Sequence, residues 1–210
     1  MTARLILAST SPWRAELLAR LQVPFEVADP ELDEAPFNSS GLPATELVVE
    51  LARAKAAAVA RGRSGVLVLG ADQVVSLDGD ILGKPGTPQR AVEQLERLAG
   101  RTHELVTGLA LHDADSGLVR TGLDVHRVTL RDLPREALVR YVSREDVTGC
   151  AGSYRIEGLG IALFAGTEGS DYTGIIGLPL TLTTKLLIWA GIDPLGESDS
   201  DLGHLENGSL

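Results

Sequence analysis

The 210-residue sequence lacks several features that would place it in common protein classes. It has one cysteine, Cys150, so no disulfide can form within the chain. No apolar run reaches the length of a membrane-spanning helix, and the N-terminal residues lack the long apolar segment and cleavage site of a secretory signal. We therefore expect a soluble, cytoplasmic protein with no membrane partner.

Positive charge is also scarce. The formal net charge is −10, whereas a protein that binds nucleic acid needs a basic face to neutralise phosphates, so we expect no nucleic-acid partner. Of the 19 Lys and Arg residues only Lys55, Lys84 and Lys185 are lysines. Because arginine is the routine surface cation of this chain, a lysine is expected where a compact, rotatable charge is needed. For Lys84 alone, a solvated turn position is an equally good explanation.

The most informative stretch reads GADQVVSLDGDILGKP, residues 70–85. The apolar residues 66–69 before it predict a buried strand that stops at Gly70, which would place Asp72 where the strand leaves the core. An Asp-Gly-Asp turn then reverses the chain and leads to Lys84. The pattern predicts a hairpin that brings a carboxylate and an ammonium to the same edge of a sheet.

A second candidate site lies near the N-terminus. A short apolar strand at residues 4–8 leads through a hydroxyl-rich loop into a helix that begins at Pro12. Unpaired backbone N–H groups and the positive end of the helix dipole make such a loop a ready anion site, which Ser9 and Arg14 would face. An ordinary capping loop with a surface arginine has the same pattern.

Acidic residues and a lysine follow in the next segments. Residues 29–34 contain four acids in six positions, which either form a solvated loop or hold a hard cation through oxygen ligands. A predicted helix at residues 45–61 carries Lys55 beside its apolar face, so that its ammonium can reach the edge of a cleft.

The whole pattern predicts an α/β fold with a mixed sheet, because strands and helices alternate at first and hairpins dominate later. We expect one domain at residues 1–192 and an acidic, disordered tail at residues 193–210. Further strands are predicted at residues 25–28, 103–112, 118–130 and 161–164, and further helices at residues 88–99, 134–142 and 180–190.

Several motifs occur in the order seen in one known family. They are LILASTSPWRAELL, the Asp33-Glu34 pair, LARAKA, GADQVV followed by GDILGKP, HELVTGLAL, GCAGSYRIEG and GIIGLPL. They resemble the Maf, or septum-formation-inhibitor, family of nucleotide pyrophosphatases, and the resemblance covers roughly residues 5–187. The resemblance implies a three-layer α/β/α sandwich with a mixed, twisted sheet and a deep cleft between two lobes, as in inosine triphosphatases. It also implies a homodimer, a divalent metal cofactor (Mg²⁺ or Mn²⁺) and hydrolysis of a nucleoside triphosphate between its α and β phosphates.

The resemblance also implies roles for individual residues. The family's key acid falls on Asp72 and its acidic metal-side position on Glu34. Its two lysines fall on Lys55 and Lys84, and its phosphate-handling loop on Ser9 and Arg14. We hypothesise that Glu34 and Asp72 hold the cation and that Asp72 orients or deprotonates the attacking water. The sequence leaves open which of these roles of Asp72 dominates.

Three positions resemble the 7-methyl-GTP branch of the family. The dTTP/UTP branch has Arg, Thr and Gln where this chain has Trp13, Gln73 and Glu157. A cationic N7-methylated guanine stacks well on an indole, and a carboxylate accepts hydrogen bonds from its Watson–Crick edge. Without the family, Trp13 is equally well explained by packing and Glu157 as a solvated loop acid. Gln73 is placed by the resemblance alone.

Other functions stay open at this point. The same cleft would serve a dTTP/UTP or ITP pyrophosphatase, or a non-catalytic nucleotide-binding protein that regulates division. Cys150 lacks an adjacent basic partner and sits in a glycine-rich segment, which favours a buried structural thiol over a nucleophile.

Overall fold

The computed structural model describes residues 3–196. Seven strands form one sheet: β1 (Arg4–Ala8), β2 (Phe25–Ala28), β3 (Val66–Leu77), β4 (Asp80–Leu82), β5 (Thr102–Asp113), β6 (Val119–Leu130) and β7 (Phe164–Glu168). The α-helices are α1 (Pro12–Ala19), α2 (Ala35–Asn38), α3 (Ala44–Ala60), α4 (Pro88–Leu98), α5 (Arg135–Val142), α6 (Thr173–Ile176) and α7 (Leu180–Trp189). Two 3-10 helices, η1 (Ala151–Ser153) and η2 (Leu159–Leu163), lie between α5 and β7. None of the helices within residues 3–196 has the length and hydrophobicity to span a membrane.

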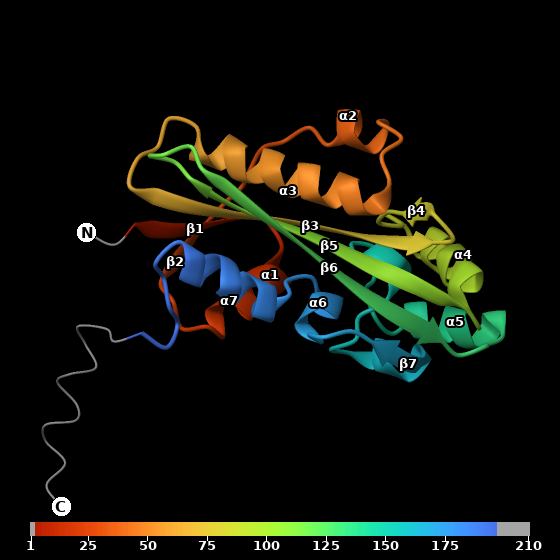
Figure 1. The fold of residues 1–210 in the computed structure, drawn as a ribbon. Coiled ribbons are helices and arrows are strands. Elements are labelled where there is room, and N and C mark those ends of the chain that lie inside the picture. Colours follow the sequence, from red (N-terminus) through yellow and green to blue (C-terminus); the bar gives the residue numbers. More distant parts are fainter. Residues whose placement is uncertain (1–2, 197–210) are drawn as a thin grey trace, which may run out of the picture.

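The sheet is mixed, as the sequence predicts. Its order is β2-β1-β3-β5-β6-β7, and β4 pairs with β3 off this path. The pairs of β1 with β2 and β3 are parallel, and all other pairs are antiparallel. The long strands β3, β5 and β6 run the length of the molecule and twist along it (Figure 1).

Helices cover both faces of the sheet, which gives three layers (Figure 1). On one face α3 packs through Ala52, Ala56 and Val59 against the even-numbered residues of β3. On the other face α1 and α7 cover the odd-numbered residues. A further core cluster joins α4 and α5 to the far ends of β3 and β5. The core is thus divided between two ends of the molecule, and the three-layer, two-lobed prediction is confirmed.

Strand β3 corrects the prediction that a strand stops at Gly70. The strand continues to Leu77, so Asp72 lies in its middle and not beyond its end. A glycine is required at this position for a different reason, because a Cβ at Gly70 would lie 2.1 Å from the carbonyl oxygen of Ala52 in α3. Gly70 therefore allows the helix to approach the sheet closely and does not end the strand.

The other local predictions are confirmed or displaced by a few residues. The strand predicted at residues 161–164 is wrong, since residues 161–163 belong to η2 and the strand is β7. Two short helices, α2 and α6, escape a search for periodicity because each has only four residues. The tail predicted at residues 193–210 lies, beyond Gly196, outside the described residues.

Candidate active site

The site forms where β3 has an open edge. Strand β1 ends at Ala8, opposite Gly70, and β4 pairs with β3 only from Val75 onward. Within residues 3–196 no strand pairs with this edge of β3 between these two points. Successive side chains of the exposed stretch point to opposite faces of the sheet, so a ligand at the edge can meet both faces.

Asp72 lies on the α3 side of this edge in a charged cluster. Lys55 of α3 places its Nζ 2.6 Å from Asp72 Oδ1 and 2.7 Å from Glu34 Oε1. The side chains of Lys55 and Asp72 are 8% and 10% exposed, whereas that of Glu34 is 42% exposed. One buried ammonium thus bridges two carboxylates that are far apart in the sequence, and its charge-assisted hydrogen bonds fix their positions.

Arg14 connects the loop around Ser9, the predicted phosphate-binding loop, to the open edge of β3. Ser11, in the hydroxyl-rich loop before Pro12, caps the N-terminus of α1. From α1 the guanidinium of Arg14 donates to the carbonyl oxygens of Ala71 (2.9 Å) and Gly177 (3.1 Å) and to Ser9 Oγ (3.5 Å). Burial lowers the pKa of Arg14, and the Asp72 and Glu34 carboxylates oppose this shift. Arg14 therefore satisfies a carbonyl of the open edge and brings positive charge beside Ser9.

Gln73 lies on the opposite face from Asp72. Its Nε2 donates to Thr107 Oγ1 of β5 at 2.8 Å and to the carbonyl oxygen of Gly174 in α6 at 2.6 Å. The side chain is half-buried and lines the cavity described below.

Trp13 and Glu157 are linked by Arg155, a residue that sequence reasoning missed. The guanidinium carbon of Arg155 lies 3.9 Å from the centre of the Trp13 ring. Arg155 Nε also donates to Glu157 Oε1 at 3.2 Å. The spacing of two residues between Arg155 and Glu157 could have indicated their ion pair. Nothing in the nearby sequence indicates that Arg155 also stacks on Trp13 of α1.

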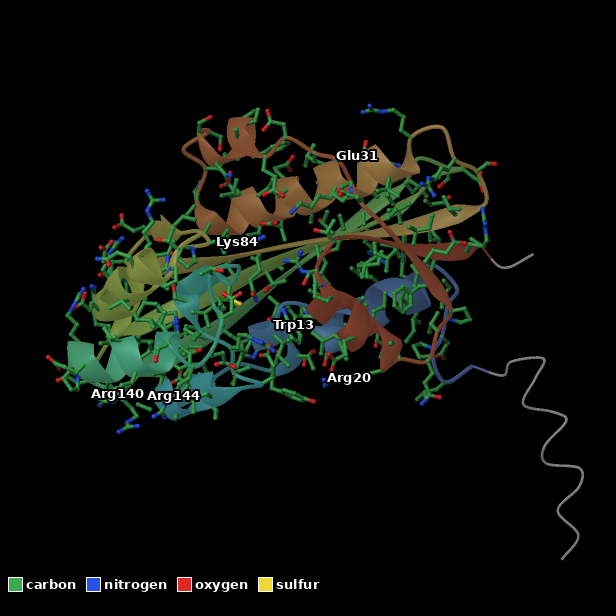
Figure 2. The ribbon with its side chains drawn as sticks, turned by 180° about the vertical axis from the view of Figure 1, so that it is seen from behind. Trp13, Arg20, Glu31, Lys84, Arg140 and Arg144 are labelled. Atoms are coloured by element: carbon green, nitrogen blue, oxygen red, sulfur yellow. The ribbon has the colours of Figure 1, made fainter. Side chains whose placement is uncertain are left out.

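All nine predicted site residues line one cavity of about 1030 Å³. Lys84 is exposed and belongs to the segment after β4, and Figure 2 shows it across from Trp13 on α1. The acids Asp29, Glu31 and Asp33 also line the cavity. The structure therefore gathers the predicted acids, cations and aromatic ring around a single cavity.

Comparison with known proteins identifies the family of the chain. The family model described as "Maf-like protein" matches residues 4–189. This chain belongs to the Maf family. A protein of Pseudomonas aeruginosa named "7-methyl-GTP pyrophosphatase" is 45% identical over 189 residues, covering 90% of this chain and 97% of that protein. A protein of Polaromonas with the same name is 46% identical over 188 residues, covering 90% and 85%. A solved HAM1 protein from Coxiella burnetii (18% identity, TM-score 0.41, 63% of this chain and 75% of that one) is too distant to carry an argument.

A divalent cation fits the donor set of this Maf protein. Glu34 and Asp72 supply the hard carboxylate oxygens that Mg²⁺ and Mn²⁺ prefer. Among residues 3–196 no three His, Cys, Asp or Glu side chains converge as a ready-made metal site. Two carboxylates suit a cation that is completed by water and substrate phosphates, which is the usual arrangement for Mg²⁺ at phosphate sites.

Cys150 also lines the cavity of the Maf site. The thiol is free and half-buried, and burial raises its pKa. A raised pKa disfavours the thiolate, the nucleophilic form, so a structural thiol remains the better interpretation.

Proposed function

We propose that this Maf protein hydrolyses 7-methyl-GTP to 7-methyl-GMP and diphosphate, and so removes a modified nucleotide. We also propose that it acts in the cytoplasm and as a homodimer. The curated relatives that share about 45% of its sequence carry the name of this activity. The observation that carries the proposal lies in the chain itself, at Trp13 and Glu157.

These two side chains already hold a planar cation. The Arg155 guanidinium stacks on the indole and directs an N–H to the carboxylate. A 7-methylguanine base has the same chemistry, because it is a planar cation whose Watson–Crick edge carries N–H donors. We propose that Trp13 and Glu157 bind such a base in exchange for Arg155. A neutral pyrimidine lacks the charge that both groups favour.

A second group of side chains that line the cavity suits a triphosphate. Arg14 and the Ser9 loop can bind phosphate oxygens, and Lys84 is exposed on the opposite wall, free to rotate toward them. We propose that these groups hold the α and β phosphates in line for attack by water. Asp72 would orient the water or accept its proton, with Lys55 fixing the carboxylate from the far side.

The metal would be held by Glu34 and Asp72. When bound, a divalent cation neutralises charge on the phosphate oxygens and polarises the bond that breaks. The Lys55 ammonium lies between these same two carboxylates, so it would neutralise their mutual repulsion whether or not the cation is bound.

The test is pyrophosphate release from 7-methyl-GTP, GTP, ITP, UTP and dTTP in Mg²⁺ or Mn²⁺. We expect the highest kcat/KM with 7-methyl-GTP, a loss of that preference in Trp13→Arg, and no change in Trp189→Phe, which alters the other tryptophan. Asp72→Asn should lose most turnover while the fold, followed by circular dichroism, stays intact. A preference for UTP or dTTP would refute the substrate, and binding without turnover would favour a regulatory nucleotide-binding protein.

A further inference from the structure

The amide of Gln73 has only one possible orientation. Its Nε2 lies 2.6 Å from the carbonyl oxygen of Gly174, which can only accept a hydrogen bond. The atom facing Gly174 must therefore be the amide nitrogen. The second N–H of the same group points to Thr107 Oγ1 at 2.8 Å, so both donors of the side chain are used.

Both partners of this amide are held rigidly. Thr107 is fully buried in β5, where it pairs in register with Gln73. Gly174 is pressed against β6, because a Cβ there would lie 2.4 Å from Asp124 Oδ2 and 3.0 Å from His126 Nδ1. Asp124 and His126 are themselves joined by a 2.9 Å hydrogen bond. The amide is thus clamped between two elements that cannot easily shift.

The remaining polar atom of Gln73 is its Oε1, an acceptor. Within residues 3–196 this oxygen accepts no hydrogen bond, although Gln73 lines the cavity. It lies toward Gly177, at 3.6 Å from the position of a Cβ on that glycine. The oxygen is therefore available to a ligand that brings its own hydrogen-bond donor.

We propose that Thr107 is a positioning residue that, with the Gly174 carbonyl, fixes Gln73 so that only a hydrogen-bond acceptor faces the nucleoside. The ligand chemistry this selects is a nucleoside N–H or O–H donor, such as the exocyclic amine of guanine or a ribose hydroxyl. The proposal rests on the function proposed above, because it assumes that Gln73 faces the nucleoside. Thr107 has no exposed surface and so acts only through Gln73.

The experiment compares Thr107→Val, Thr107→Ser and Gln73→Met. Valine keeps the shape of threonine but has no oxygen, so the amide of Gln73 loses one of the two hydrogen bonds that hold it, and its Oε1 is less firmly positioned. We expect kcat/KM for 7-methyl-GTP to fall about fivefold to tenfold in Thr107→Val and in Gln73→Met, which is the range of one hydrogen bond. Thr107→Ser keeps the hydroxyl and should restore most of the activity.

The decisive measurement is the double variant Thr107→Val/Gln73→Met. If Thr107 acts through Gln73, the double variant should be no worse than Gln73→Met alone, because the group that Thr107 orients has gone. Thr183→Val is the matched control, since Thr183 of α7 is also fully buried but its hydroxyl donates to the carbonyl oxygen of Pro179, which precedes that helix. Additive losses, failure of Thr107→Ser to rescue, or an equal loss in Thr183→Val would overturn the proposal.

Two substrate analogues identify the donor. If the exocyclic amine meets Gln73, the Thr107→Val penalty should vanish with 7-methyl-ITP, which lacks that amine. If a ribose hydroxyl does, it should vanish with 2′-deoxy-7-methyl-GTP or its 3′-deoxy counterpart. A penalty that persists with all three analogues would refute the proposal. The kcat/KM values of the wild-type protein for the five nucleotides test the proposed function separately. If another nucleotide proves to be the substrate, the double variant can still be compared with the single variants on that nucleotide.

Discussion

Replacing Arg155 by methionine tests whether the base binds by exchange with an internal cation. The substitution keeps an unbranched, largely apolar stem and removes the charge and the N–H donors. Stacking on Trp13 at 3.9 Å leaves no space for a base between the two groups, so a base on that face must displace the guanidinium. Every nucleotide that uses this face therefore bears the cost of breaking the Arg155 contacts.

The magnitude follows from those contacts. A partly exposed cation–π stack contributes about 1 kcal/mol, and the pair with Glu157, whose side chain is 27% exposed, contributes about 0.5 kcal/mol. Removing both should strengthen base binding by about 1.5 kcal/mol, or about tenfold. Because the cost is the same in the ground state and the transition state, KM should fall and kcat should stay unchanged.

The assay is steady-state kinetics with 7-methyl-GTP and GTP, together with calorimetric affinity for the product 7-methyl-GMP. Exchange predicts that KM falls by a similar factor for both substrates, because the cost of displacing Arg155 does not depend on the base. Arg120→Met is the matched control, since Arg120 stacks on Trp189 at 5.0 Å and neither residue lines the cavity. A raised KM in Arg155→Met would refute exchange and show that the guanidinium contacts the nucleotide directly.

Three further predictions concern the charged cluster and a buried histidine. Lys55→Met should destabilise the protein by about 3 kcal/mol, measured by urea unfolding, because it leaves the 10%-exposed Asp72 side chain without its cation. Adding Asp72→Asn to Lys55→Met should recover much of that loss, and equal instability of the single and double variants would contradict the bridge. Glu34→Gln should raise the Mg²⁺ concentration needed for half-maximal activity while leaving the unfolding midpoint in EDTA within a few degrees of wild type, and an unchanged metal dependence would remove Glu34 from the metal site. Burial lowers the pKa of His103 to about 4 from 6.5, so the unfolded chain binds a proton that the folded protein does not. Stability should therefore fall by roughly 3 kcal/mol as pH drops from 6.5 to 4, a dependence that His103→Gln should remove.

Local patterns predicted most of the regular structure because the deciding interactions are local. The hydroxyl-rich loop followed by a proline predicted the start of α1, and the period of apolar residues predicted α3. Gly70 was misinterpreted because a glycine in an apolar run can have two explanations that the sequence does not distinguish. It can mark the end of a strand, or it can allow another element to approach the strand closely. Only the position of the Ala52 carbonyl separates them.

The candidate site was predictable as a set of residues but not as a set of contacts. Lys55 and Asp72 could each be selected from their surroundings, yet the ammonium that bridges Asp72 to Glu34 depends on how α3 packs on the sheet. The partners of Gln73 and Arg14 in the segment around α6 lie 101 and 163 residues away in the chain. These partners are backbone carbonyl groups. Every residue has one, so the amino-acid sequence does not indicate which of them accepts a hydrogen bond. Arg155 was missed for a different reason, because the ring on which it stacks, Trp13, belongs to α1 and lies far away in the sequence.

The open edge of β3 presents two adjacent side chains to opposite faces of the sheet, and the proposed function assigns them different roles. Asp72 and Gln73 are adjacent, so the pleat sends one side chain to the α3 face and the next to the α6 face. Under the proposed function, the phosphate chemistry at Asp72 and the recognition of the nucleoside at Gln73 would be separated by the thickness of a strand and held in a fixed relation. That relation requires an exact register, because a slip of one residue would exchange the two faces. Two glycines secure it, since a Cβ at Gly70 or at Gly108 of β5 would strike the backbone of α3. The same helix that supplies Lys55 thus sets the register that aims Gln73 at the other face.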